Sequence, residues 1–250
     1  MADDGVWVGA HVADGTWIAV AFDRAGFDHA ATFDGIGDLW FRYEEDAAAI
    51  LVDVPIGLVE EAEGERECDE LARTLVGPRA DEIVAPPARE ALRKRRYPVA
   101  NRTHERATGV SLSERAFELS ETIATVDQLL REFSEARDLL AAAHPEVAFL
   151  AFAGERMEHD RRTAGGYAER LRTLASIDRD APPAVQSAAE AVDDAPVTVA
   201  DVLDAVALAY TALPHEGRLR SLPPRPPLDD NGLPMQIVYR ADAALVEPTA

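Results

Sequence analysis

The sequence predicts an α/β protein built on a mixed sheet flanked by helices. Three strand-like runs come first, and the first two are separated by Asp14-Gly15, a strong hairpin signal. A helix-compatible segment then leads into a further apolar run, and this β-β-β-α-β order implies strands that run in both directions. The strand-like runs are residues 6–11, 16–22 and 27–33, the helix-compatible segment is 36–48, and the further run begins at residue 50.

Helical patterns dominate the rest of the chain. Residues 60–136 are mostly polar and helix-compatible, and their place between two core strands predicts an inserted helical lobe. The clearest helix covers 113–133, and Ser111 with Glu114 has the capping-box spacing at its start. We further expect a strand over 138–143, helices over 166–177 and 199–213, and a short strand over 236–239. Residues 179–196 are expected to hold one short helical stretch at most, and the Pro-rich segment 214–234 little regular structure.

Length and composition indicate one expected domain over residues 1–240, followed by a flexible tail over 241–250. No run approaches the ~20 apolar residues that span a bilayer, the first four residues lack the features of a signal peptide, and Cys68 is the only cysteine. The chain is therefore expected to be soluble and cytoplasmic. A net charge of −21 with a single lysine, Lys94, resembles the composition of proteins from extreme halophiles. We therefore relate the charge to a solvent of high salt concentration, and it says little about the binding partner.

Asp53 is the first candidate for a functional residue. It lies near the end of an apolar strand and is followed by Pro55 and Gly57, so regular strand pairing should stop there. Ligand sites in open α/β sheets lie just beyond the carboxyl ends of strands. A carboxylate there is costly unless it meets a metal, another cation or several donors. A turn-capping aspartate is the other interpretation.

Asp201 and Asp204 lie three residues apart at the start of the predicted helix 199–213, so they share a face. Acids at a helix start are also favoured by the helix dipole, which explains at least one of them without a ligand. Because this helix is apolar over most of its surface, it should pack on the sheet and aim its first turn at the strand ends. Together with Asp53, these acids would form an oxygen-rich site suited to Mg²⁺ or Mn²⁺.

Two further groups of polar residues have two interpretations each. His144 and Glu146 follow the predicted strand 138–143, and form either a ligand or acid/base pair or an ordinary helix start with a favourably placed acid. Arg66 and Arg73 share a helix face, and either bind phosphate or form ion pairs on a solvated surface. Cys68 is more consistent with a small core residue than with a nucleophile.

These segments together resemble the DUF429 family, whose members are described as predicted nucleases with an RNase H-like fold. The matching segments are 51–58, 66–73, 85–89, 109–113, 123–127, 144–146, 201–205 and 232–239, in order over roughly residues 6–240. The resemblance implies an RNase H-like core of three antiparallel strands, a helix and further strands, with an inserted helical lobe. In active members of that wider fold, acidic side chains hold two divalent cations that activate water and stabilise the leaving oxygen.

Carried over to this sequence, Asp53 matches the acid of the fourth strand, and Asp201 and Asp204 match the acids of the last helix. Two positions depart from the family pattern: His11 stands where the first strand usually has aspartate, and Ala142 where a glutamate is usual. Because histidine can give one nitrogen to one metal and cannot bridge two, the resemblance implies a reduced site. The candidate metal ligands are Asp53, Asp201 and His11. The candidate catalytic residues are Asp53, Asp201, Asp204, His144 and Glu146. The candidate phosphate- or substrate-binding residues are Arg66, Arg73 and Arg89.

The function expected from this reading is Mg²⁺- or Mn²⁺-dependent phosphodiester hydrolysis by a nuclease with one metal. The alternative is a catalytically inactive RNase H-like module that binds nucleic acid, a nucleotide or a protein partner, which His11 and Ala142 favour. A third hypothesis, an enzyme acting on a phosphorylated small molecule, has no Gly-rich phosphate loop to support it. The sequence leaves the substrate and the oligomeric state open.

Overall fold

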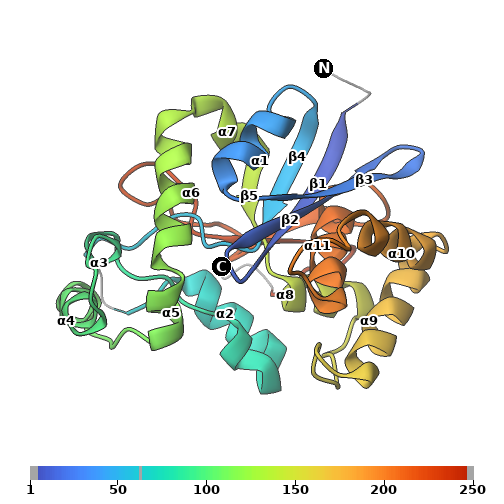
Figure 1. The fold of residues 1–250 in the computed structure, drawn as a ribbon. Helices are drawn as coiled ribbons and strands as arrows, with labels where there is room; N and C mark the ends of the chain where they lie inside the picture. Colours follow the sequence, from blue (N-terminus) through green and yellow to red (C-terminus); the bar gives the residue numbers. More distant parts are fainter. Residues whose placement is uncertain (1–4, 62–63, 247–250) are drawn as a thin grey trace.

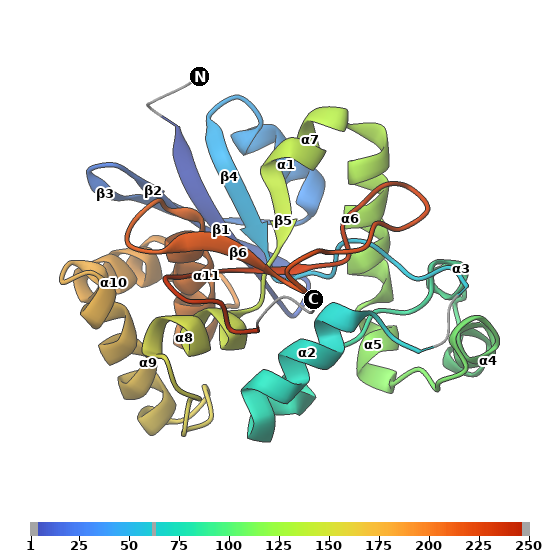
Figure 2. The same cartoon turned by 180° about the vertical axis from the view of Figure 1, so that it is seen from behind.

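The computed structural model describes residues 5–61 and 64–246, and its centre is a five-stranded mixed sheet (Figures 1 and 2). The strands are β1 (Val6–Ala13), β2 (Thr16–Asp23), β3 (Gly26–Phe33), β4 (Ala47–Val52) and β5 (Leu140–Ala142), in the spatial order β3-β2-β1-β4-β5. The first three are antiparallel, whereas β4 runs parallel to both β1 and β5. The predicted mixed α/β fold is therefore confirmed, with the three-strand meander, helix and further strands that the resemblance implied.

The hairpin between β1 and β2 follows from two residues. Asp14 has φ 46° and Gly15 has φ 85°, so both lie in the left-handed region. A two-residue turn in which both residues have positive φ matches the right-handed twist of the two strands that it joins. Asp-Gly is one of the residue pairs that adopt this turn most readily. This turn sets the register in which His11 pairs with Ile18.

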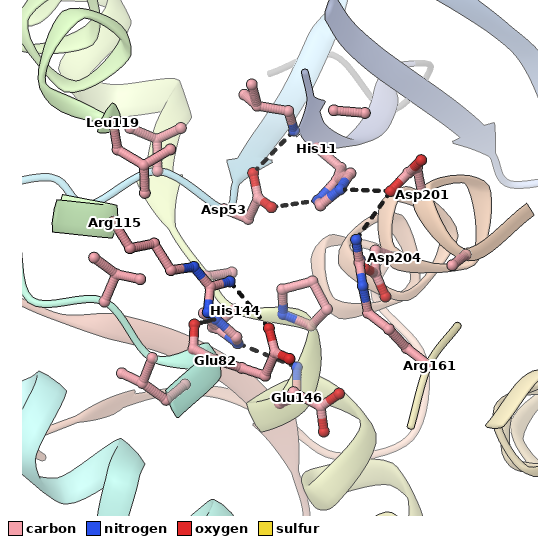
Figure 3. Close-up of a pocket in the computed structure, with 18 of the residues that line it drawn as sticks. His11, Asp53, Glu82, Arg115, Leu119, His144, Glu146, Arg161, Asp201 and Asp204 are labelled. Carbon is pink, nitrogen blue, oxygen red and sulfur yellow. Dashed lines mark hydrogen bonds and ion pairs between the residues drawn. The ribbon is translucent and has the colours of Figure 1, made fainter. Parts of the chain in front are cut away.

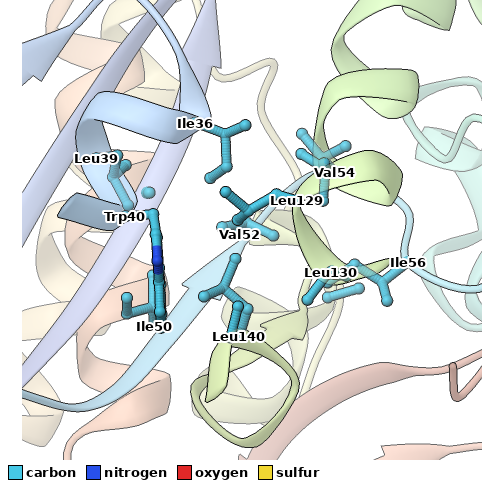
Figure 4. Packing of buried hydrophobic residues seen from close by; sticks show 14 of the residues in the cluster. Ile36, Leu39, Trp40, Ile50, Val52, Val54, Ile56, Leu129, Leu130 and Leu140 are labelled. Atoms are coloured by element: carbon cyan, nitrogen blue, oxygen red, sulfur yellow. The ribbon is translucent and has the colours of Figure 1, made fainter. Parts of the chain in front are cut away.

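Helices cover both faces of the sheet (Figure 1). One face packs against α1 (Ile36–Tyr43), α6 (Ser120–Glu132) and α7 (Ser134–Leu139). Its core, drawn in Figure 4, joins Ile50 and Val52 of β4 to Leu39, Leu129 and Leu140. The other face packs against α11 (Val199–Ala212), which is surrounded by α8 (Pro145–Ala153), α9 (Ala164–Ile177) and α10 (Ala181–Ala191). The sheet is thus buried on both sides, as its apolar strands require.

Strand alternation decides which side chains meet α11. On β1, Val8 and Ala10 belong to the core on the α1 side, whereas Trp7 packs with Leu208 of α11. Gly9 lies on the same side as Trp7, and a Cβ there would lie 2.1 Å from a backbone nitrogen of α11. The missing side chain therefore lets α11 lie directly against the centre of the sheet. His11, two residues further on, points to that same side.

The helices between β4 and β5 gather beyond the carboxyl end of β4 (Figures 1 and 2). They are α2 (Glu67–Val76), η1 (Gly77–Glu82), α3 (Arg89–Leu92), α4 (Tyr97–Thr108) and α5 (Glu114–Glu118), followed by α6 and α7. This is the segment in which an inserted lobe was predicted over 60–136. The limits of the predicted domain and tail remain predictions, and residues 247–250 of that tail lie outside the described part.

Three local predictions were wrong. The helix predicted over 113–133 is two helices, α5 and α6, which meet at Leu119, and the cap is Ser113 rather than Ser111, because its hydroxyl accepts the Ala116 N–H. Residues 181–191 form α10, a full helix whose two prolines lie in its first turn, where no intrahelical N–H is needed. Residues 218–222 form β6 (Arg218–Leu222), which pairs with β7 (Ile237–Ala241) in a separate two-stranded sheet. The strand β6 is short, with the sequence RLRSL and only its last residue buried, so it lacks the apolar run by which the core strands were recognised.

Some boundaries also differ. The helix predicted over 36–48 ends at Tyr43, and the strand predicted over 138–143 is only Leu140–Ala142, because α7 extends to Leu139. Within residues 5–61 and 64–246, no helix combines the length and apolar character needed to cross a membrane.

Candidate functional site

A cavity of about 710 Å³ opens where β1 and β4 end, between the inserted helices and the first turns of α9 and α11 (Figure 3). Residues from many separate parts of the chain line it. They include His11, Asp53, His144, Glu146, Asp201 and Asp204. The structure therefore brings together the residues that were predicted as catalytic or metal-binding, at the sheet edge where α/β proteins bind ligands.

His11 lies between two of the predicted acids. Its Nδ1 contacts Asp53 Oδ2, and its Nε2 lies 3.2 Å from Asp201 Oδ1. The other Asp53 oxygen accepts the Val12 backbone N–H at 3.2 Å. Burial alone would lower the pKa of His11, but the charges and hydrogen bonds of Asp53 and Asp201 outweigh burial and the nearby Arg161, and raise it to about 9. His11 is therefore a cation at neutral pH, bound to both carboxylates.

Asp201 has a structural role as well as a place in the pocket. Its Oδ2 accepts the backbone N–H of Thr198 at 2.8 Å and the Thr198 hydroxyl at 2.7 Å, which completes a capping box at the start of α11. Its Oδ1 faces His11. Although burial opposes ionisation, the hydrogen bonds from His11 and Thr198 hold the pKa of Asp201 well below its usual value.

Arg161, which the sequence interpretation did not single out, is the second cation of the site. It lies between α8 and α9, its Nη2 is 3.0 Å from Asp201 Oδ1, and its Nη1 contacts Asp204 Oδ2. Asp204 is 2% exposed, and its Oδ1 has no hydrogen-bond partner among the described residues. The only hint in the sequence is that Arg161 and Arg162 stand together just before the predicted helix 166–177 in a strongly acidic chain.

The acids of the site do not fit a divalent cation in this arrangement. Their oxygens are the hard ligands that Mg²⁺ and Mn²⁺ prefer. However, the oxygens of Asp53 and Asp201 already accept hydrogen bonds from His11, Arg161, Thr198 and the Val12 backbone N–H. In the part of the chain that the structure describes, no group of three or more His, Cys, Asp or Glu side chains is arranged to hold a metal ion. Mg²⁺ or Mn²⁺ binding stays a prediction.

His144 and Glu146 adopt the geometry of a helix start. His144 Nε2 donates to the Glu82 carbonyl at 3.2 Å, and its Nδ1 accepts the Glu146 backbone N–H at 3.2 Å, so neither nitrogen is open to a ligand. Burial lowers the pKa of His144, which is consistent with this neutral form. The Glu146 carboxylate pairs with the buried Arg170 and lies 3.8 Å from Arg79. Both residues line the pocket, while their proposed role in catalysis stays a prediction.

The three arginines predicted to bind phosphate all carry carboxylate partners. Arg66 donates to Asp69 at 2.6 and 2.8 Å and to the carbonyls of residues 56 and 57, so it secures the loop after β4. Arg73 pairs with Glu65, and Arg89 contacts three carboxylates, those of Glu60, Asp127 and Asp229. Arg66 lines the pocket, but Arg73 and Arg89 do not. Phosphate binding by these residues stays a prediction.

The inserted lobe gives the pocket an apolar side that also carries one ion pair, and the start of α9 gives it a polar side. Arg115 of α5 pairs with Glu82 at 3.0 Å on the inserted lobe, beside apolar residues of the same lobe. On the facing side, Arg162, Thr163 and Tyr167 come from the start of α9. The apolar residues are Ile83, Val84, Leu119 and Ile123. Sequence reasoning missed these residues because none of them stands out from ordinary helix and loop residues.

The sequence profile of one family, described as "Protein of unknown function (DUF429)", matches residues 8–228. The chain belongs to the DUF429 family. Comparisons with curated proteins and with solved structures found no match. The matched region of this DUF429 protein includes His11, Asp53, Asp201 and Asp204, so the acids and their histidine partner lie within the family's shared region. The family description itself names no activity.

Proposed function

We propose that this DUF429 protein is an RNase H-like module that binds a nucleotide, or the end of a nucleic acid strand, in its pocket without cleaving it by a divalent-metal mechanism. The observation that carries this proposal is the pairing of all three predicted acids with side-chain cations. His11 contacts Asp53 and Asp201, and Arg161 contacts Asp201 and Asp204. We also propose a cytoplasmic location, which a chain with a single cysteine supports.

Charged groups on the α9 side support binding of a phosphate ester. Arg162 is exposed at the pocket, and its guanidinium has no ion-pair partner among the described residues. It stands next to Thr163, the N-cap of the 14-residue helix α9, whose first backbone N–H groups and dipole favour an anion. A guanidinium beside a helix start suits the oxygens of a phosphate.

The size and the apolar side of the pocket support a ligand with a base. A cavity of about 710 Å³ lies within the range of about 300–1,000 Å³ that small-molecule sites occupy. Tyr167 and Leu119 line it from facing elements and offer apolar surface to an aromatic ring. A ligand that carries both a phosphate and a base would use both sides of the pocket.

Calorimetric titration with 5′-AMP, 5′-CMP and a short oligo(dT) tests this proposal, over a range of KCl concentrations because phosphate contacts weaken with salt. We expect binding without added metal, and Arg162→Ala should weaken it about tenfold or more, as the loss of a charge-assisted hydrogen bond implies. Arg218→Ala, which removes an exposed arginine of β6, is the matched control. No binding of any of these ligands at millimolar concentration would refute the proposal.

A second candidate is the Mg²⁺- or Mn²⁺-dependent phosphodiester hydrolase expected from the sequence. Two observations favour it: Asp53, Asp201 and Asp204 line one pocket, and the buried Asp204 Oδ1 lacks a partner among the described residues. A cleavage assay on single-stranded DNA and RNA with MnCl₂, MgCl₂ or EDTA separates the two candidates. Metal-dependent cleavage that Asp53→Asn abolishes, and that the exposed control Asp38→Asn retains, would establish the hydrolase and overturn the first proposal.

A further inference from the structure

We infer that His11 and Arg161 are built-in counterions that occupy the place of a divalent cation among Asp53, Asp201 and Asp204, and that His11→Asp converts the pocket into a Mn²⁺ site. This inference deepens the proposed function, on which it rests, because it explains why the pocket would bind its ligand without metal. Figure 3 shows the two cationic side chains lying among the three carboxylates.

The positive charge on His11 follows from hydrogen-bond geometry. An ionised carboxylate accepts hydrogen bonds and cannot donate them. Because Nδ1 faces Asp53 and Nε2 faces Asp201, both ring nitrogens must carry a proton, which makes the ring an imidazolium. The residue is 6% exposed, so water replaces neither contact. The ring therefore joins the end of β1 to the end of β4 and to the first turn of α11.

Asp201 has no oxygen site left for a metal. A carboxylate offers about four lone-pair positions. Asp201 receives four donors, since Oδ1 faces His11 and Arg161 while Oδ2 accepts the backbone and hydroxyl protons of Thr198. A metal could reach Asp201 only after one of these donors leaves. The contact of its guanidinium with Asp204 also holds Arg161 in place, and the capping box holds Thr198.

Replacing His11 by aspartate should open oxygen positions for a metal ion. The substitution removes the shared cation, frees one position on Asp53 and one on Asp201, and adds a new carboxylate beside these two. The shorter side chain also leaves the volume of the imidazole ring empty between these oxygens. Three largely enclosed carboxylates that face one another repel strongly unless a cation lies between them. A hard divalent ion with several oxygen ligands meets that need.

Mn²⁺ titration of the full chain tests the inference, with free Mn²⁺ followed by electron paramagnetic resonance and the unfolding temperature measured with and without the ion. We expect no stoichiometric Mn²⁺ site in the wild type. The variant His11→Asp should bind about one Mn²⁺ per chain and unfold at a higher temperature with Mn²⁺ than with EDTA. Adding Asp53→Asn to that variant should remove the site, and the neutral control His11→Asn should not create one.

Two outcomes would overturn the inference. One is a stoichiometric Mn²⁺ site in the wild type that Asp53→Asn removes. The other is a folded His11→Asp variant that binds no Mn²⁺. If His11→Asp does not fold in EDTA, the variant is refolded in MnCl₂. Recovery of the fold with Mn²⁺ would support the inference, and an unfolded variant in the presence of Mn²⁺ would contradict it. Nucleotide binding by the wild type is measured separately, so a failure of the proposed function is distinguishable from a failure of this inference.

Discussion

Raising the pH from 6.5 to about 9 should destabilise this protein mainly through one buried residue, His11. Its pKa is raised from 6.5 to about 9 in the folded state, while in the unfolded chain it returns to the ordinary value. A group whose pKa is higher in the folded state contributes stability that is fully present below its unfolded pKa. That contribution is lost as the pH rises through the folded pKa. The window of loss therefore runs from about pH 6.5 to about pH 9.

The size of the effect follows from the two pKa values. Each pKa unit corresponds to about 1.4 kcal/mol, so the difference between the folded and unfolded values of His11 corresponds to about 3 kcal/mol of unfolding free energy. The groups that face the ring are Asp53, Asp201 and Arg161. Burial lowers the pKa of His104, His144 and His215, so these residues titrate below this window.

Urea unfolding at half-unit steps between pH 6 and pH 10, in constant KCl, measures this contribution as the difference between the wild type and His11→Asn. Above about pH 9 the buried Cys68, whose pKa is also raised, lowers the stability of both proteins alike. We expect the wild type to lose about 3 kcal/mol across the window, while His11→Asn starts less stable and changes little. The two curves should approach each other above pH 9. Equal pH dependence in the wild type and in His11→Asn would refute the reasoning, because it would place the titrating group elsewhere.

Three further predictions concern the fold. Gly9→Ala should destabilise the protein by about 3 kcal/mol or more in thermal unfolding, since its Cβ would lie 2.1 Å from the α11 backbone. The control Gly37→Ala places its Cβ in open space and should be neutral or stabilising. Arg89→Ala should lower the unfolding free energy by about 3–5 kcal/mol in urea, because it leaves buried carboxylates unpaired. The control Lys94→Ala removes an exposed ion pair and should lower it by less than about 0.5 kcal/mol. Similar losses in the two variants would contradict the argument. Cys68 is fully buried, and burial raises its pKa to about 12. A thiol reagent at pH 8 should therefore label it only at the rate at which the protein unfolds locally or globally. Rapid stoichiometric labelling of the native chain would contradict this.

The sequence determined the features of this protein that depend on local periodicity and turn chemistry. Short apolar runs and the Asp14-Gly15 turn indicated the meander, because strand and turn preferences depend on only a few neighbouring residues. The same local rules placed Asp53 after β4, Asp201 in the first turn of α11 and Asp204 in the second. They indicated that the three acids meet at one sheet edge, since strand ends and a buried helix have few ways to pack.

Only the tertiary structure decided how those charges are paired. Arg161 comes from a loop between two helices, and no periodicity connects it to acids 40 residues further along the chain. Arg89 likewise contacts Asp229, 140 residues away. Charge attraction depends on distance in space and on burial, and neither quantity is set by neighbouring residues. For that reason the sequence identified the acids and His11 as members of one site, whereas the fold alone showed that His11 and Arg161 lie between those acids as cations.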